Sequence, residues 1–105
     1  MKKTTFLLVL AASLCASTVF ADEFTGVISD SHCGAVHHTG GEKDIACVNK
    51  CLGGGADPVL VSNGKVIKID ADSRDKAKTF GGQSVKIDGT MKDGAIAINT
   101  IDKNQ

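Results

Sequence analysis

Cysteine and histidine side chains cluster in one short stretch of this 105-residue chain, between residues 31 and 51. The stretch contains every histidine and three of the four cysteines: His32, Cys33, His37, His38, Cys47 and Cys51. Its spacing is Cys33-x₃-His37 and then, after nine residues, Cys47-x₃-Cys51. Thiolate and imidazole are the ligands that proteins use for Zn²⁺ and, where thiolates dominate, for Cu(I). The segment therefore suggests a metal site.

The Cys47-x₃-Cys51 pair lies in a segment, residues 42–52, that the sequence predicts to be a short helix. Residues four apart on a helix lie one turn above each other, so both thiols point the same way. A disulfide between them is awkward, because their Cβ atoms are ~5–6 Å apart and a disulfide needs ~3.8 Å. Two thiolates on one helical face can instead converge on a metal. Cys33 and His37 then complete a Cys₃His set for tetrahedral Zn²⁺ or, with fewer ligands, for Cu(I).

A disulfide is the competing interpretation of the same cysteines. Cysteines of exported proteins are usually oxidised, so Cys33 can bridge to Cys47 or Cys51 and leave one thiol spare. A thiol redox role is a third interpretation, although the spacing is not Cys-x-x-Cys and no βαβ pattern surrounds it. The sequence leaves these alternatives open.

The sequence gives little support to catalysis. Cys33, His37 and Asp30 can be drawn as a nucleophilic set, but no oxyanion-hole motif accompanies them, and Asp30 is expected to be a turn residue. The glycine run at residues 53–55 follows the predicted helix, so it is expected to end that helix and not to bind phosphate. We therefore predict that the protein is not an enzyme.

The first 21 residues have the pattern of a secretory signal peptide. A basic start at Lys2 and Lys3 precedes an apolar run over residues 6–12, and small residues lead to a cleavage site after Ala21. The run is shorter than the ~20 apolar residues that span a bilayer, so we expect no membrane insertion after cleavage. Cys15 leaves with the signal peptide, and the protein is expected to be periplasmic or secreted.

The mature chain, residues 22–105, carries 10 basic and 12 acidic residues and only two aromatic ones, Phe24 and Phe80. A slightly acidic chain with so few aromatics lacks the positive field and the stacking platforms of a nucleic-acid-binding protein. Its 84 residues suit one domain with a small core. We therefore expect a disulfide or a metal to add to its stability.

The order of the predicted elements places the cysteine segment between two strands. A first strand precedes a loop with the helix, two hairpins turn at Asn63-Gly64 and Asp93-Gly94, and a short helix capped by Asp72 or Ser73 separates the hairpins. The expected strands are 24–30, 59–62, 65–69, 84–91 and 95–101, the expected loop is 31–41, the expected helices are 42–52 and 74–80, and 102–105 is a frayed polar tail.

The two-residue turns set the expected strand register. The first hairpin pairs Val61 with Val66 and Leu60 with Ile67, and the second pairs Met91 with Ile96 and Ile87 with Thr100. Six side chains are predicted to form the core: Leu60, Ile67, Val85, Ile87, Ile96 and Ile98.

Five strands with a helix between the third and fourth predict a mainly β fold. This order is that of a small OB-like Greek-key barrel with one or two short helices. An open α+β sheet is the alternative, because element order does not show whether the sheet closes.

Four motifs together carry a resemblance: Gly-Val-Ile-Ser-Asp-Ser-His-Cys-Gly-Ala at 26–35, Cys-x₃-Cys at 47–51, Val-Leu-Val-x₃-Lys-Val at 59–66, and Val-Lys-Ile-Asp-Gly-Thr at 85–90. In them the mature chain resembles a group of small exported bacterial proteins of unknown function, a likeness that implies no activity. The leading hypothesis is a periplasmic protein that binds a metal through Cys33, His37, Cys47 and Cys51. The alternative is a disulfide-stabilised module that binds another envelope protein or a small ligand without metal.

Overall fold

The computed structural model describes residues 21–36 and 40–104, and in these segments it contains five strands and two α-helices. Two 3₁₀ turns, η1 (Gly34–Val36) and η2 (Ala71–Ser73), complete the regular structure. The strands and α-helices are β1 (Asp22–Asp30), α1 (Glu42–Gly53), β2 (Pro58–Ser62), β3 (Lys65–Ile69), α2 (Arg74–Lys78), β4 (Ser84–Lys92) and β5 (Ala95–Lys103).

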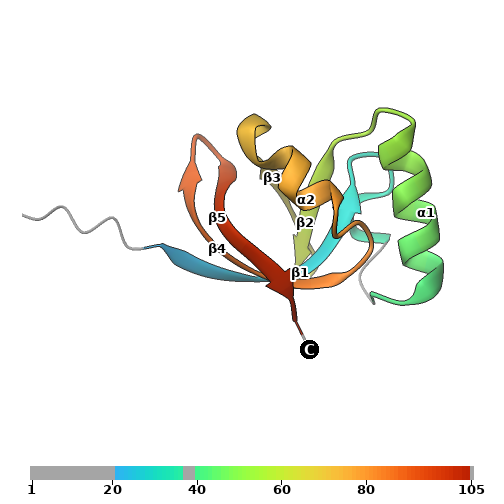
Figure 1. Ribbon diagram of the computed structural model, residues 1–105, viewed down its shortest axis with the longest axis horizontal. Coiled ribbons are helices and arrows are strands. Elements are labelled where there is room, and N and C mark those ends of the chain that lie inside the picture. The colour runs from blue at the N-terminus through green and yellow to red at the C-terminus, as the bar shows by residue number, and fades with distance from the viewer. Residues whose placement is uncertain (1–20, 37–39, 105) are drawn as a thin grey trace, which may run out of the picture.

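The five strands form one mixed sheet that closes in a ring, in the order β1-β2-β3-β5-β4 with β4 paired back to β1 (Figure 1). All neighbours are antiparallel except β3 and β5, which run parallel through two residue pairs, Lys68–Ala95 and Ile69–Ile96. The prediction of a mainly β fold is confirmed. The alternative of an open sheet is wrong, because every strand pairs with two neighbours and the β3–β5 pair closes the ring.

The first hairpin has the predicted register, with Val61 opposite Val66 and Leu60 opposite Ile67. Asn63 and Gly64 both adopt positive φ, 51° and 77°, as this two-residue turn requires. β2 is buried on both faces, since Leu60 is 0% and Val61 only 4% exposed, whereas Val66 of β3, opposite Val61, leaves 48% of its surface exposed.

The second hairpin begins in the predicted register, with Met91 opposite Ile96, but the predicted pair of Ile87 and Thr100 is wrong. Ile87 faces Ile101, because the register shifts by one residue beside Gly89. A bulge of this kind places two residues of one strand against one of its neighbour. As a result, Ile101 returns to the inward face and packs against the core.

The predicted frayed tail at residues 102–105 is wrong for its first three residues. β5 continues to Lys103, which pairs with Val85, and the Asn104 N–H donates to the Ser84 carbonyl at 3.0 Å. Gln105 lies outside the described residues. Backbone pairing with β4 thus orders a segment that has few apolar side chains to anchor it.

The core lies inside the ring and contains the predicted residues. Ile67 is half-buried and packs against the core, together with Phe24, Phe80 and Ile101. The buried cluster is Ile28, Leu60, Ile69, Ala77, Val85, Ile87, Ile96 and Ile98.

The second helix is shorter than the predicted 74–80, because α2 ends at Lys78. Ser73 precedes α2, but its side chain does not cap the helix. The buried Ser73 hydroxyl instead accepts the Ile98 N–H of β5 at 2.8 Å. Ser73 thus occupies the predicted N-cap position, but the prediction that its side chain caps the helix is wrong. The hydroxyl joins the start of α2 to the sheet.

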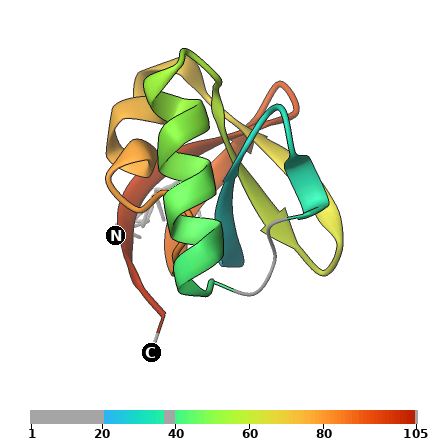
Figure 2. The same ribbon diagram turned by 90° about the vertical axis from the view of Figure 1, so that its right-hand side faces the viewer.

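The first helix covers the outside of the ring and matches its predicted bounds to within one residue. It buries Val48 and Leu52 and runs beside the turn that follows β1 (Figure 2). Gly82 lies against the helix backbone, where a Cβ would collide with Ile45. Neither helix in the described segments combines the length and apolar character needed to cross a membrane.

Candidate metal centre

Three thiols meet where the turn after β1 approaches α1. The Sγ atoms of Cys33, Cys47 and Cys51 all lie within 4.8 Å of one another. Cys33 and Cys51 are half-buried, whereas Cys47 is exposed. The cluster is therefore at the protein surface, with one thiol open to solvent and two partly covered.

The packing of α1 against the ring orients two of the three thiols. Val48 and Leu52 of α1 are buried, and Cys47 and Cys51 each precede one of them, so the two cysteines occupy the edge of the buried face. The Cys51 carbonyl accepts the N–H groups of Gly54 and Ala56, both at 3.1 Å. These hydrogen bonds fix the last turn of α1 and, with it, the position of Cys51.

The third thiol is positioned by a buried carboxylate at the end of β1. Asp30 is fully buried, and its Oδ1 atom accepts the backbone N–H groups of His32 and Cys33, both at 2.9 Å. The Cys33 carbonyl in turn accepts the Val36 N–H at 3.2 Å. Asp30 is the turn residue that the sequence predicted, and the turn directs Cys33 toward α1.

Further hydrogen bonds attach this turn to the ring. The buried Ser29 hydroxyl donates to the Gly34 carbonyl at 2.7 Å. The Ser31 N–H donates to the Asp57 carbonyl at 2.8 Å, and the Asp57 N–H donates to the Ser31 hydroxyl at 3.1 Å. The turn is therefore joined to the segment that enters β2.

The surroundings of the thiols oppose their ionisation. Desolvation is the main cause that raises the pKa of Cys33 and of Cys51, and the negative charge of Asp30 is the second. The charges of Cys47 and Cys51 raise the pKa of Cys33 further, and the charge of Cys47 raises the pKa of Cys51, whereas a hydrogen bond with Cys33 lowers the pKa of Cys51. A bound cation would reverse this balance, because it stabilises thiolates directly.

The separation of the sulfur atoms suits a shared metal ion. A Zn–S bond of about 2.3 Å puts two sulfur ligands of a tetrahedron about 3.8 Å apart, within the 4.8 Å limit that the three atoms satisfy. All three cysteines are free thiols. The predicted disulfide is not formed in this structure.

Comparison with protein-family models, curated proteins and solved structures finds no match. The arrangement of the site is therefore the basis for any statement about function.

The structure brings together three of the four predicted ligands. The fourth, His37, and the neighbouring His38 lie outside the described residues. His32 is exposed and takes part in the turn through its backbone N–H. It is not among the ligand atoms that cluster within the described segments.

Sequence reasoning missed the support around the thiols. Asp30 was expected to form a turn, but not to lie fully buried beside two cysteines. A signal was present, because an aspartate that ends an apolar strand two or three residues before a cysteine is well placed to accept backbone N–H groups. The contact between Ser31 and Asp57 joins residues far apart in sequence and has no such local signal.

Proposed function

We propose that this chain is a small non-enzymatic protein that binds a soft or borderline metal ion, Zn²⁺ or Cu(I), through Cys33, Cys47 and Cys51. The observation that supports this proposal is the mutual approach of three sulfur atoms to within 4.8 Å. Thiolates select these ions over hard cations such as Mg²⁺ and Ca²⁺.

His37 is the proposed fourth ligand for Zn²⁺, since structural zinc is almost always four-coordinate. It follows Cys33 by four residues and precedes α1 in the sequence. Cu(I) would need fewer ligands, so the three thiolates would be enough to bind it. The contribution of His37 therefore separates the two metals.

The wider setting of the proposal comes from the sequence. The signal-peptide pattern of residues 1–21 supports a periplasmic or secreted protein, and the ring order β1-β2-β3-β5-β4 supports an OB-type barrel. In that compartment the metal would serve stability, storage or delivery.

A disulfide-stabilised binding module is the second candidate. It is favoured by the proximity of Cys33 to both helix cysteines, since oxidation of one pair would tie the turn after β1 to α1. Such a module would bind another envelope protein or a small ligand through its ring. One cysteine would remain as a thiol.

A thiol count distinguishes the two candidates on protein purified without reductant. Alkylation followed by intact-mass measurement gives the number of free thiols, and elemental analysis gives the bound metal. Three thiols with one equivalent of Zn or Cu support the metal site. One disulfide, one thiol and no metal would exclude the metal site as the native state.

Single substitutions test the ligand set. Each reduced variant competes with a chromophoric chelator for Zn²⁺ or Cu(I). Each of Cys33→Ser, Cys47→Ser and Cys51→Ser should weaken binding by more than the roughly 10–100-fold that loss of a supporting hydrogen-bond partner costs. His37→Ala should weaken Zn²⁺ binding and leave Cu(I) binding nearly unchanged. His32→Ala is the matched control and should change neither affinity.

A further inference from the structure

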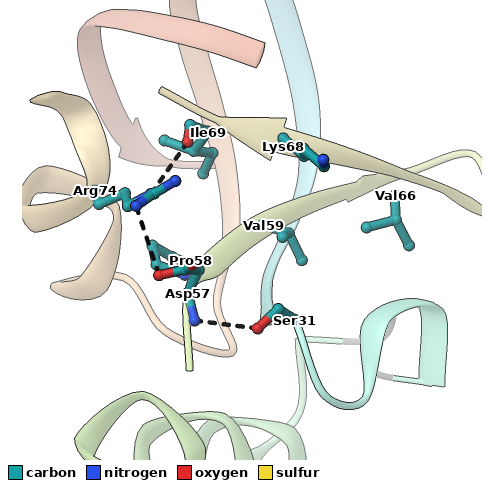
Figure 3. A pocket seen from close by; sticks show the side chains of 8 residues that line it. All are labelled: Ser31, Asp57, Pro58, Val59, Val66, Lys68, Ile69 and Arg74. Atoms are coloured by element: carbon teal, nitrogen blue, oxygen red, sulfur yellow. Dashed lines mark hydrogen bonds and ion pairs between the residues drawn. The ribbon is translucent and has the colours of Figure 1, made fainter. Parts of the chain in front are cut away.

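A cavity of about 270 Å³ opens between the β2–β3 hairpin and the start of α2, and none of the three clustered cysteines lines it. One part of its wall is apolar, formed by Val59, Val66 and Ile69 (Figure 3). Val66 leaves 48% of its surface in water. A ligand with an apolar body would cover this side chain and gain hydrophobic free energy.

The polar side of the cavity is built around Arg74, the only arginine in the chain. Its Nε donates to the Ile69 carbonyl at 3.4 Å, and its Nη1 lies 3.7 Å from Asp57 Oδ1. Figure 3 shows the guanidinium between these two partners. A planar guanidinium is the side chain that best matches a carboxylate with two parallel hydrogen bonds.

The charges around the cavity favour an anion. Lys68 and Arg74 contribute two positive charges to its lining, and Asp57 contributes one negative charge. The Arg74–Asp57 pair is long, and its side chains are 40% and 56% exposed. Ion pairs of this kind are weak, so a ligand carboxylate can compete with Asp57 for the guanidinium.

We propose that this cavity binds a small organic carboxylate with an apolar body, its charge on Arg74 and Lys68 and its chain against Val59 and Val66. The volume sets the size of the ligand, since it lies just below the ~300–1,000 Å³ of typical small-molecule pockets. A short aliphatic carboxylate fits this range. The inference is independent of the metal proposal, because it uses none of the thiols.

Four probes of matched structure test the chemical class of the ligand. Each is added to the reduced mature chain, and its binding is followed by the NMR shifts of the methyl groups of Val59, Val66 and Ile69. Hexanoate tests the complete ligand, acetate lacks the apolar chain, hexylamine reverses the charge and hexanol removes it. Hexanoate should bind at least tenfold more tightly than each of the other three. Equal binding of hexylamine or hexanol would overturn the role of the cations, and equal binding of acetate would overturn the apolar wall.

Two substitutions with opposite expected effects test the residues. Arg74→Gln should weaken hexanoate binding at least tenfold, whereas Asp57→Asn should tighten it, because the competing negative charge is removed. Lys76→Gln is the matched control, since it removes one positive charge from the same helix at a residue that does not line the cavity. It should leave the affinity unchanged within twofold.

Circular dichroism and urea unfolding of each variant establish that the fold is intact. If Arg74→Gln is unstable, Arg74→Lys is used, which keeps the charge but loses the two-pronged geometry, and it should still weaken hexanoate severalfold. The proposal is overturned if hexanoate leaves the three methyl signals unmoved, or if folded Arg74 variants bind it as the unsubstituted protein does.

Discussion

The buried carboxylate of Asp30 accepts the backbone N–H of Cys33 at 2.9 Å and also raises the pKa of the Cys33 thiol through its negative charge. One side chain thus shapes the turn that carries the thiol and opposes ionisation of that thiol. These two effects can be separated by substitution, because only one of them depends on charge.

Asp30→Asn keeps a carbonyl acceptor for the His32 and Cys33 N–H groups but removes the charge. We expect the pKa of Cys33 to fall, so that iodoacetamide alkylates the variant faster than the unsubstituted protein at pH 8. Asp30→Ala removes the acceptor as well, and it should lower the free energy of unfolding by about 1–3 kcal/mol, because the partly buried N–H groups of His32 and Cys33 lose their partner. An equal loss of stability in both variants would contradict the hydrogen-bonding role.

The raised pKa values of Cys33 and Cys51 predict a pH dependence for the metal-free, reduced protein. The folded state retains the thiol protons more strongly than the unfolded chain, whose thiols titrate near pH ~8.5. This contribution to stability is complete below that pH and is lost as the pH rises through the higher values of the folded state. Urea unfolding with reductant should therefore give a free energy of unfolding that falls as the pH rises above ~8.5.

The control for this titration is the double variant Cys33→Ser, Cys51→Ser, in which both groups are absent. Its stability should fall less over the same pH range. If both proteins lose the same free energy, groups other than these thiols control the alkaline transition.

Ile87 tests the packing of the ring. The side chain is fully buried in the core and faces Ile101 across the hairpin. Ile87→Ala should therefore lower the free energy of unfolding by roughly 2–5 kcal/mol, measured by urea denaturation. A loss below about 1 kcal/mol, the size expected of a surface substitution, would contradict its burial.

Gly82 tests how the ring positions α1. Its φ is +78°, and an added Cβ would collide with the backbone of Ile45 at the start of the helix. Gly82→Ala should cost more than the ~1–3 kcal/mol expected for backbone strain alone, and it should weaken metal binding because Cys47 and Cys51 shift with the helix. The readouts are urea unfolding and the chelator competition.

Gly94→Ala is the matched control for Gly82→Ala. Gly94 has nearly the same φ, +80°, but no atom within 4 Å of the added Cβ. It should show the backbone strain without the collision and keep its metal affinity. Equal losses of stability at the two positions would mean that contact with α1 is unimportant.

The sequence predicted the hairpins well because their determinants are local. Asn63-Gly64 adopts the positive φ values that a two-residue turn needs, and this turn fixes the pairing of Leu60 with Ile67. The second hairpin departs from prediction beyond Gly89, where the register shifts. Gly89 was a local signal for it, since an isolated glycine inside a strand often marks a bulge, but the direction and size of the shift depend on the fit of the strands in the closed ring.

The thiol site was predictable in part for the same reason. Spacing alone places Cys47 and Cys51 on one helical face. The approach of Cys33 depends on the burial of Asp30 and on the Ser31–Asp57 contact, which require the assembled ring. The contribution of His37 stays a prediction.

The ring order also constrains when the chain can finish folding. The first half of β1 pairs with β4, and the parallel contact that completes the circle joins β3 to β5 at Ile69 and Ile96. During synthesis the amino-terminal strand therefore leaves the ribosome long before one of its partners exists. The ring therefore cannot close before β5 has been synthesised, and its closure depends on contacts between residues far apart in the sequence, which are slow to form.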